Sequence, residues 1–155
     1  LLLETCPLSP LVGERVYEIR SELFPARGFG FQLTTLDDFE AVSANVYKLA
    51  SYFTENDIAH NLAMMRGKRF ENNDDNDDDD SYDVIRIFVW AREKVVGQKD
   101  PGAFVIAGCE CAGQILVYDE DKFKNLDENE VAKMHRETCE NTFNDVRPNV
   151  IKLFS

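Results

Sequence analysis

The stretch "VIRIFVWAR" (Val84–Arg92) alternates between two kinds of side chain along its whole length. One set of alternate positions is entirely apolar and comprises Ile85, Ile87, Val89 and Ala91. The other set interleaves arginine with aromatic residues and comprises Arg86, Phe88, Trp90 and Arg92. Successive side chains of a strand point to opposite faces of a sheet. The period of two therefore predicts a core β-strand with two chemically different faces.

The flanking segments predict a sheet and helices around this strand. Turn residues at 97–102 are followed by a second apolar run, which predicts a β-hairpin around residues 84–118, and a further short strand is predicted near 29–35. Apolar residues at helical spacing predict helices at 9–24, 36–53, 58–66 and 128–146, the last ending before Pro148. The fold class that follows is α+β, with a small and mostly antiparallel sheet packed by three to four helices.

Length and composition indicate a single globular domain over residues 1–155. A hydrophobic content of 44% in 155 residues is enough to form a core. No apolar run reaches the ~18 to 20 residues that would cross a bilayer. Four cysteines are too few for a disulfide scaffold, so we expect reduced thiols and an intracellular protein, cytoplasmic or nuclear.

Charge is concentrated in an acidic loop at residues 71–83. This loop holds eight carboxylates and no lysine or arginine, whereas the rest of the chain has 21 acidic and 17 basic residues. Its densest part comprises Asp74, Asp75, Asp77, Asp78, Asp79 and Asp80. An EF-hand needs glycine at its sixth position and a carboxylate at its twelfth, and registers beginning at Asp74 or Asp75 provide neither. A solvated connector, a contact for a basic partner and a weak cation site remain as interpretations.

The cysteines and histidines offer one metal-binding hypothesis. Cys109 and Cys111 share a face if they lie on a strand, and His135 and Cys139 share a face if they lie on a helix. A hairpin followed by a helix would bring the four residues together as a Cys3His zinc site. The spacing "CEC" is not that of a usual zinc knuckle. Packing of small thiols in the core, or a redox pair, explains the same residues.

Other chemistries find less support. The sequence lacks the nucleophile-elbow, metalloprotease and P-loop patterns, and His60 stands alone in a predicted helix, so we expect no catalytic residues. Aromatic residues interleaved with arginine can bind single-stranded nucleic acid. The net charge of −12 and the neighbouring acidic loop disfavour that partner.

The sequence alone therefore predicts a non-enzymatic regulatory domain that binds another protein. Its contact residues would be the acidic loop and the face formed by Arg86, Phe88, Trp90 and Arg92, which has the composition of a protein-binding hot spot if it is exposed. The partner would carry a basic surface, and the acidic loop would in one variant of this hypothesis imitate nucleic acid. No cofactor is expected. The alternative is a zinc-binding domain, structural or catalytic, that uses the Cys3His site.

Overall fold

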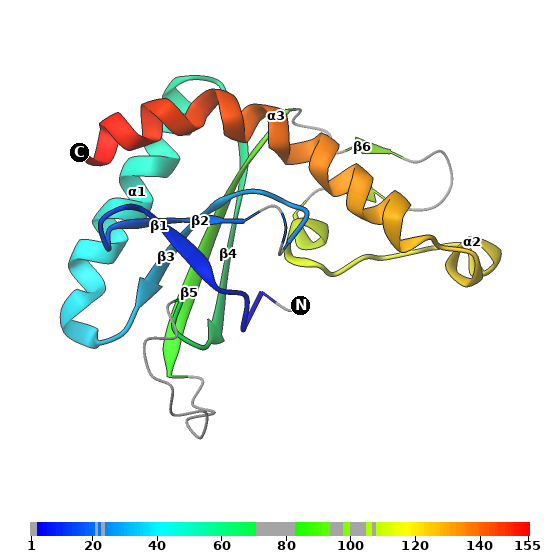
Figure 1. Ribbon diagram of the computed structural model, residues 1–155, viewed down its shortest axis with the longest axis horizontal. Coiled ribbons are helices and arrows are strands. Elements are labelled where there is room, and N and C mark those ends of the chain that lie inside the picture. The colour runs from blue at the N-terminus through cyan, green and yellow to red at the C-terminus, as the bar shows by residue number, and fades with distance from the viewer. Residues whose placement is uncertain are drawn as a thin grey trace.

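The computed structural model describes residues 3–20, 22, 24–70, 83–93, 98–99, 105–106 and 108–155. Its centre is a five-stranded antiparallel sheet with the strand order β1-β2-β3-β5-β4 (Figure 1). The strands are β1 (Leu8–Val12), β2 (Val16–Ile19), β3 (Phe29–Leu33), β4 (Ala59–Gly67) and β5 (Val84–Arg92). Together with the helices described below, this sheet confirms the predicted α+β fold class.

β5 is a buried strand with a neighbour on each side, which confirms the predicted core strand. It pairs with β3 on one side and with β4 on the other, so that Val89 lies opposite both Phe29 and Leu62. Its alternation separates two hydrophobic cores, because Val89 belongs to one and Trp90 to the other. Both side chains are fully buried.

Two long helices cover the sheet. α1 (Phe39–Glu55) buries Leu49 and Phe53 in the core that contains Val89. α3 (Glu128–Phe154) belongs to both cores, because its C-terminal half packs beside α1 and its N-terminal half packs on the Trp90 side. The ribbon diagram shows α3 running past one end of the sheet (Figure 1), where the backbone N–H of Glu93 donates to the carbonyl of Thr138 at 3.1 Å.

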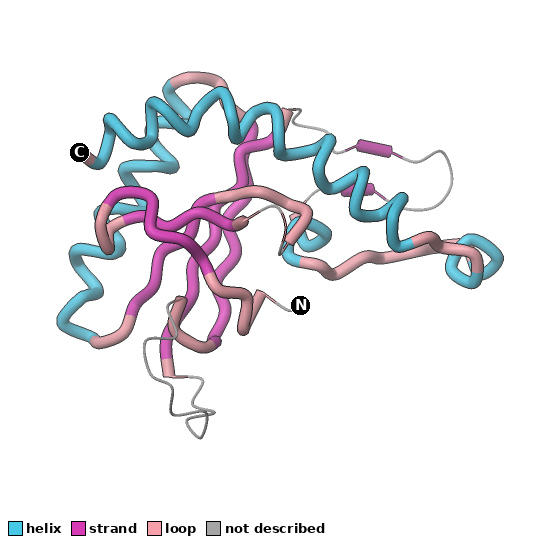
Figure 2. Tube along the Cα trace, viewed as in Figure 1, coloured by secondary structure: helices cyan, strands magenta, loops and turns pink. Residues whose placement is uncertain are grey.

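The remaining elements are short. They are η1 (Leu36–Asp38), β6 (Gln98–Lys99), β7 (Val105–Ile106), η2 (Cys109–Ala112) and α2 (Glu120–Lys124). Figure 2 shows the loop after η2 leading away from the sheet to α2, at the far end of the molecule from α1. Among the described residues, no helix is both long enough and apolar enough to cross a membrane.

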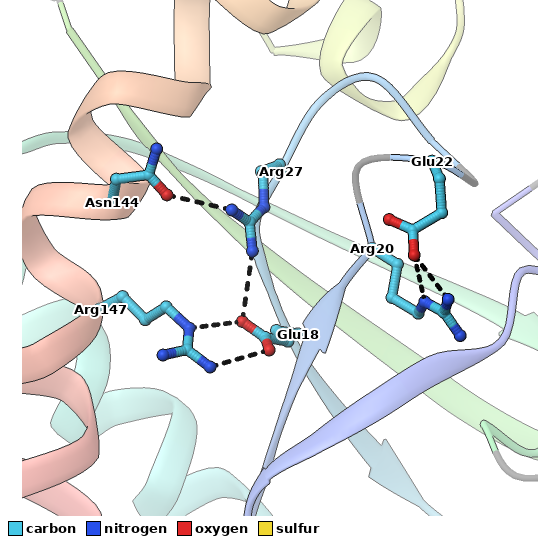
Figure 3. Close-up of polar contacts among 6 residues, drawn as sticks. All are labelled: Glu18, Arg20, Glu22, Arg27, Asn144 and Arg147. Atoms are coloured by element: carbon cyan, nitrogen blue, oxygen red, sulfur yellow. Dashed lines mark hydrogen bonds and ion pairs between the residues drawn. The ribbon is translucent and has the colours of Figure 1, made fainter.

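A partly buried ion-pair network joins α3 to β2 (Figure 3). Both carboxylate oxygens of Glu18 accept hydrogen bonds from Arg147, at 2.8 and 3.0 Å. Arg27 also reaches Glu18, at 3.4 Å, while its other terminal nitrogen donates to Asn144 at 3.0 Å. The Arg27 guanidinium lies 4.1 Å from the ring centroid of Phe143, so one arginine contacts a carboxylate, an amide and an aromatic ring.

Two predicted helices are strands in the structure. Residues predicted as a helix at 9–24 form β1 and β2 around a turn in which Gly13 has a φ of +53°. The predicted helix at 58–66 is β4, paired with β5 at nine consecutive positions. Val16 and Tyr17 are neighbours and both are buried, because both faces of the sheet are covered at β2. Such strands lack the polar alternation that distinguishes a strand from a helix.

The predicted hairpin at 84–118 is confirmed only in part, because β6 and β7 pair antiparallel within this range but β5 pairs with neither of them. β5 pairs with β3 and β4, while β6 and β7 form a separate two-stranded sheet, and residues 109–112 are a 3-10 helix. The helix predicted to stop before Pro148 continues through it to Phe154. The predicted strand near 29–35 is confirmed as β3. Thr35 and Asp38 form a capping box at the start of η1.

Candidate functional site

The face of β5 that the sequence nominated for partner binding lies inside the molecule. Arg86, Phe88 and Trp90 have no exposed surface, and Arg92 is 8% exposed. Trp90 donates its indole N–H to the carbonyl of Ala26 at 3.2 Å and stacks on Phe88. The face is covered because the N-terminal segment, η2 and half of α3 pack on this side of the sheet. It therefore offers no surface to a partner. The other predicted contacts, Asp74 to Asp80, lie outside the described residues.

Arg86 has a structural role at this position. Its guanidinium donates hydrogen bonds to the carbonyl oxygens of Leu3 and Cys6, and it lies 4.6 Å from the ring centroid of Phe70. Burial lowers the pKa of Arg86 to about 10, which leaves the side chain charged at neutral pH. The buried cation therefore holds the N-terminal segment against the sheet.

Two of the four predicted zinc ligands meet in the core. The thiol of Cys139 on α3 donates a hydrogen bond to the sulfur of Cys111 on η2, and neither residue is exposed. Donation to Cys111, together with burial, raises the pKa of Cys139. The accepted hydrogen bond, helped by the nearby Arg92 cation, lowers the pKa of Cys111. Cys109 is exposed instead, because residues two apart on a 3-10 helix do not share a face as they would on a strand.

His135, the predicted histidine ligand, has both ring nitrogens within hydrogen-bond distance of backbone carbonyl groups. Its Nδ1 lies 2.9 Å from the carbonyl oxygen of Val131, and its Nε2 lies 2.6 Å from that of Glu110. A carbonyl oxygen only accepts hydrogen bonds, so each nitrogen faces an acceptor and neither lone pair is directed at a metal. In the part of the chain that the structure describes, no group of three or more histidine, cysteine, aspartate or glutamate side chains is arranged to hold a metal ion. The predicted Cys3His cluster therefore does not assemble.

In the described part of the chain, a cleft of about 340 Å³ lies beside His135. Its walls come from the N-terminal segment, the loop before β3, the end of η2 and the first two turns of α3. The lining residues are Leu3, Phe24, Pro25, Ala112, Gly113, Ile115, Glu128, Val131, Ala132 and His135. Gly113 closes η2 with a φ of +89°, a conformation that favours glycine. A Cβ atom placed on Gly113 would lie 3.9 Å from the Phe24 ring.

The chemistry of the cleft is that of binding. Its lining is apolar except for the Glu128 carboxylate and the His135 ring, and the ring is held by two carbonyl groups. The lining therefore contains no nucleophile paired with a base, and a catalytic pair would need both. A mostly apolar site of this volume with one well-placed polar group is typical of a pocket that orients a ligand.

Comparison with known proteins assigns the chain to a family. A family model described as "GDPGP1-like, C-terminal domain" matches residues 12–155. The chain belongs to this family. Proteins named GDP-D-glucose phosphorylase 1 are similar to it: the Xenopus laevis protein is 30% identical over 131 residues (84% of this chain and 32% of the relative). The human protein is 32% identical over 129 residues (83% and 32%), and the Caenorhabditis elegans protein 29% over 126 residues (79% and 26%). No solved structure matches the chain.

Membership of this family corrects the function expected from the sequence. The prediction of a non-enzymatic regulatory domain was wrong, because the relatives are named as enzymes. The chain spans about a third of the length of the relatives it matches. The sequence in which no catalytic motif was found therefore corresponds to about a third of these relatives.

Sequence reasoning missed the cleft because of how it is built. Its residues come from four separate segments, and none forms a motif with its neighbours. The sequence "FP" (Phe24 and Pro25) was the one local signal, because the residue before a proline disfavours the helical conformation and so marks an end of regular secondary structure. That signal predicts a turn and says nothing about a ligand.

Proposed function

We propose that this chain is the C-terminal domain of an enzyme that cleaves GDP-D-glucose with inorganic phosphate. The observation that carries the proposal is the family match over residues 12–155, supported by relatives named GDP-D-glucose phosphorylase 1. The matched region is described as a C-terminal domain, and the relatives are about three times as long as the matched part. The domain contributes to substrate binding in this proposal, and the reacting groups come from elsewhere in the enzyme.

The cleft beside α3 receives the guanine of the substrate. GDP-D-glucose has three chemically different parts: a flat base, an anionic diphosphate and a sugar rich in hydroxyl groups. The cleft does not fit the diphosphate, because its lining provides no lysine or arginine and the Glu128 carboxylate repels an anion. The sugar is also a poorer match than the base, because mostly apolar walls would leave many of its hydroxyl groups without a hydrogen-bond partner. Guanine suits both features, since its face can stack on Phe24 and its ring and amino N–H groups can donate to a carboxylate.

The test of the function is an assay of the purified natural protein that contains this chain. We expect consumption of GDP-D-glucose that requires inorganic phosphate. Absence of consumption, or an equal rate without phosphate, would contradict the proposal. Both are read by separating the guanine nucleotides chromatographically over time.

The guanine assignment is tested in the same assay with Glu128→Gln. This change keeps the size of the side chain but weakens its hydrogen bonds to guanine, and losing the charge costs about 1.5 kcal/mol, or roughly a tenfold increase in KM with kcat nearly unchanged. The matched control is Glu130→Gln, which removes the same charge from the same first turn of α3 but does not line the cleft. Equal KM values for the two variants would remove Glu128 from the site.

A further inference from the structure

β4 is an edge strand that lacks the features by which edge strands are protected. Free edges pair with other strands unless they are short, bulged, charged or interrupted by proline. β1, at the opposite edge, has five residues, contains Pro10 and changes register between Pro10 and Val12. β4 has nine residues without proline and pairs with β5 in one unbroken register. β1 therefore has features that oppose pairing with a further strand, and β4 does not have them.

Among the described residues, the outer side of the β4 backbone has no strand paired to it. About half of the residues in an antiparallel edge strand point their N–H and C=O groups away from the neighbouring strand. Within the described part of the chain, no backbone hydrogen bond joins residues 59–66 to any strand other than β5. The strand contains one lysine, arginine or acidic residue, Arg66, so charge does little to oppose pairing.

One face of β4 is also apolar and uncovered. Leu62 is 48% exposed and Met64 is 64% exposed, although their neighbours on β5, Val89 and Ile87, are buried. On that face α1 packs over β3 and reaches the start of β4, where the ring centroid of Phe53 lies 5.6 Å from that of His60, but it leaves Leu62 and Met64 exposed. An apolar strip therefore continues from the covered core to the open edge of the sheet.

We propose that β4 docks, through its free edge and through Leu62 and Met64, against the part of the enzyme that lies outside this chain. The inference rests on the proposed function, because it takes its occupant from relatives about three times as long as the matched region. The contact it requires is an apolar strand or loop edge. Leu62 and Met64 provide the apolar part of this contact, and Arg66 is exposed on the same face beside them.

Oxidation of Met64 reports on this contact directly. Hydrogen peroxide transfers one oxygen atom to the thioether sulfur, giving the sulfoxide and water, and the rate follows the exposure of the side chain. We expect Met64 in the purified natural protein to react as slowly as Met134, which is 8% exposed. In Leu62→Lys, where a charge enters the contact, Met64 should react at least ~10-fold faster, as expected for a newly opened site. Peptide mass spectrometry over a time course measures both rates.

A matched control variant and a measurement of the protein's molar mass in solution complete the test. Leu36→Lys makes the same change at a residue on η1 that is 88% exposed, and it should leave Met64 slow. Fast oxidation of Met64 in the unchanged protein overturns the proposal. So does a dimer that Leu62→Lys converts to a monomer, because the occupant is then a second copy. If Leu62→Lys also exposes Met134, the milder Leu62→Ser decides by the same two criteria. No substrate is present, so the result is independent of whether GDP-D-glucose is consumed.

Discussion

Arg86 is the single residue whose removal we expect to destabilise the protein most. Its side chain has no exposed surface and is the donor for the carbonyl groups of Leu3 and Cys6. Arg86→Met keeps much of the apolar packing against Phe70 but leaves both carbonyl groups without this donor. We expect the free energy of unfolding to fall by about 2–4 kcal/mol. Urea denaturation of the two proteins measures the difference.

The control for this prediction is a surface arginine. Arg20 pairs with Glu22, and both side chains are more than half exposed, so Arg20→Met should change stability by less than about 1 kcal/mol. Burying a charge is itself costly, and apolar replacements of buried ion pairs are sometimes neutral or stabilising. Unchanged or increased stability of Arg86→Met would show that Arg86 does not anchor the N-terminal segment.

At the scale of the element, the start of α1 should make stability depend on pH. One oxygen of Asp38 accepts hydrogen bonds from the hydroxyl of Thr34 at 2.7 Å, the hydroxyl of Thr35 at 2.8 Å and the N–H of Thr35 at 3.1 Å. These bonds, that of Thr34 first, lower the pKa of Asp38 in the folded protein. The contribution of Asp38 to the free energy of unfolding is therefore fully present above the ordinary carboxyl pKa near 4. It is lost as the pH falls through the lowered pKa of the folded protein.

Asp38→Asn removes this titration. The variant should be less stable than the unchanged protein at pH 6, and the difference should shrink as the pH approaches 2. Asp37→Asn is the matched control, since Asp37 precedes Asp38 in η1 and accepts none of these three hydrogen bonds. Urea midpoints between pH 2 and pH 6 give the comparison. A difference that stays constant over that range would exclude the carboxylate of Asp38 as its source.

The elements differ in how well local sequence predicts their secondary structure. β5 was predictable because its alternation separates two cores, and the start of α1 was predictable because Thr35 and Asp38 bond locally. β4 was not predictable, because "AHNLAMMRG" consists largely of residues that favour helices. It becomes a strand by pairing with β5, whose partner residues lie between 17 (Gly67 with Val84) and 33 (Ala59 with Arg92) positions away. Pro148 misled for a related reason: packing of Val150 and Phe154 in the core keeps α3 helical beyond it.

At the scale of the whole molecule, the candidate site depends on tertiary contacts between distant segments. Phe24 and Glu128 are 104 positions apart in the sequence, yet both line the cleft. The prediction of a zinc site was wrong because it placed Cys109 and Cys111 on a strand, whereas these residues form η2 in the structure. The enzyme family emerged from similarity over nearly the whole chain, which no single motif carried. Local patterns could therefore supply parts of the fold but neither the cleft nor the function.

Hydrogen exchange of the natural protein with and without GDP-D-glucose tests most directly whether this domain takes part in substrate binding. Phosphate is left out, so the substrate is expected to bind without being cleaved. Amide exchange should slow in the two segments that frame the cleft, residues 112–115 and 128–135, because a bound guanine restricts their opening. GDP-D-glucose that slows exchange elsewhere in the protein, but leaves both segments unchanged, would contradict a substrate-binding role for this domain.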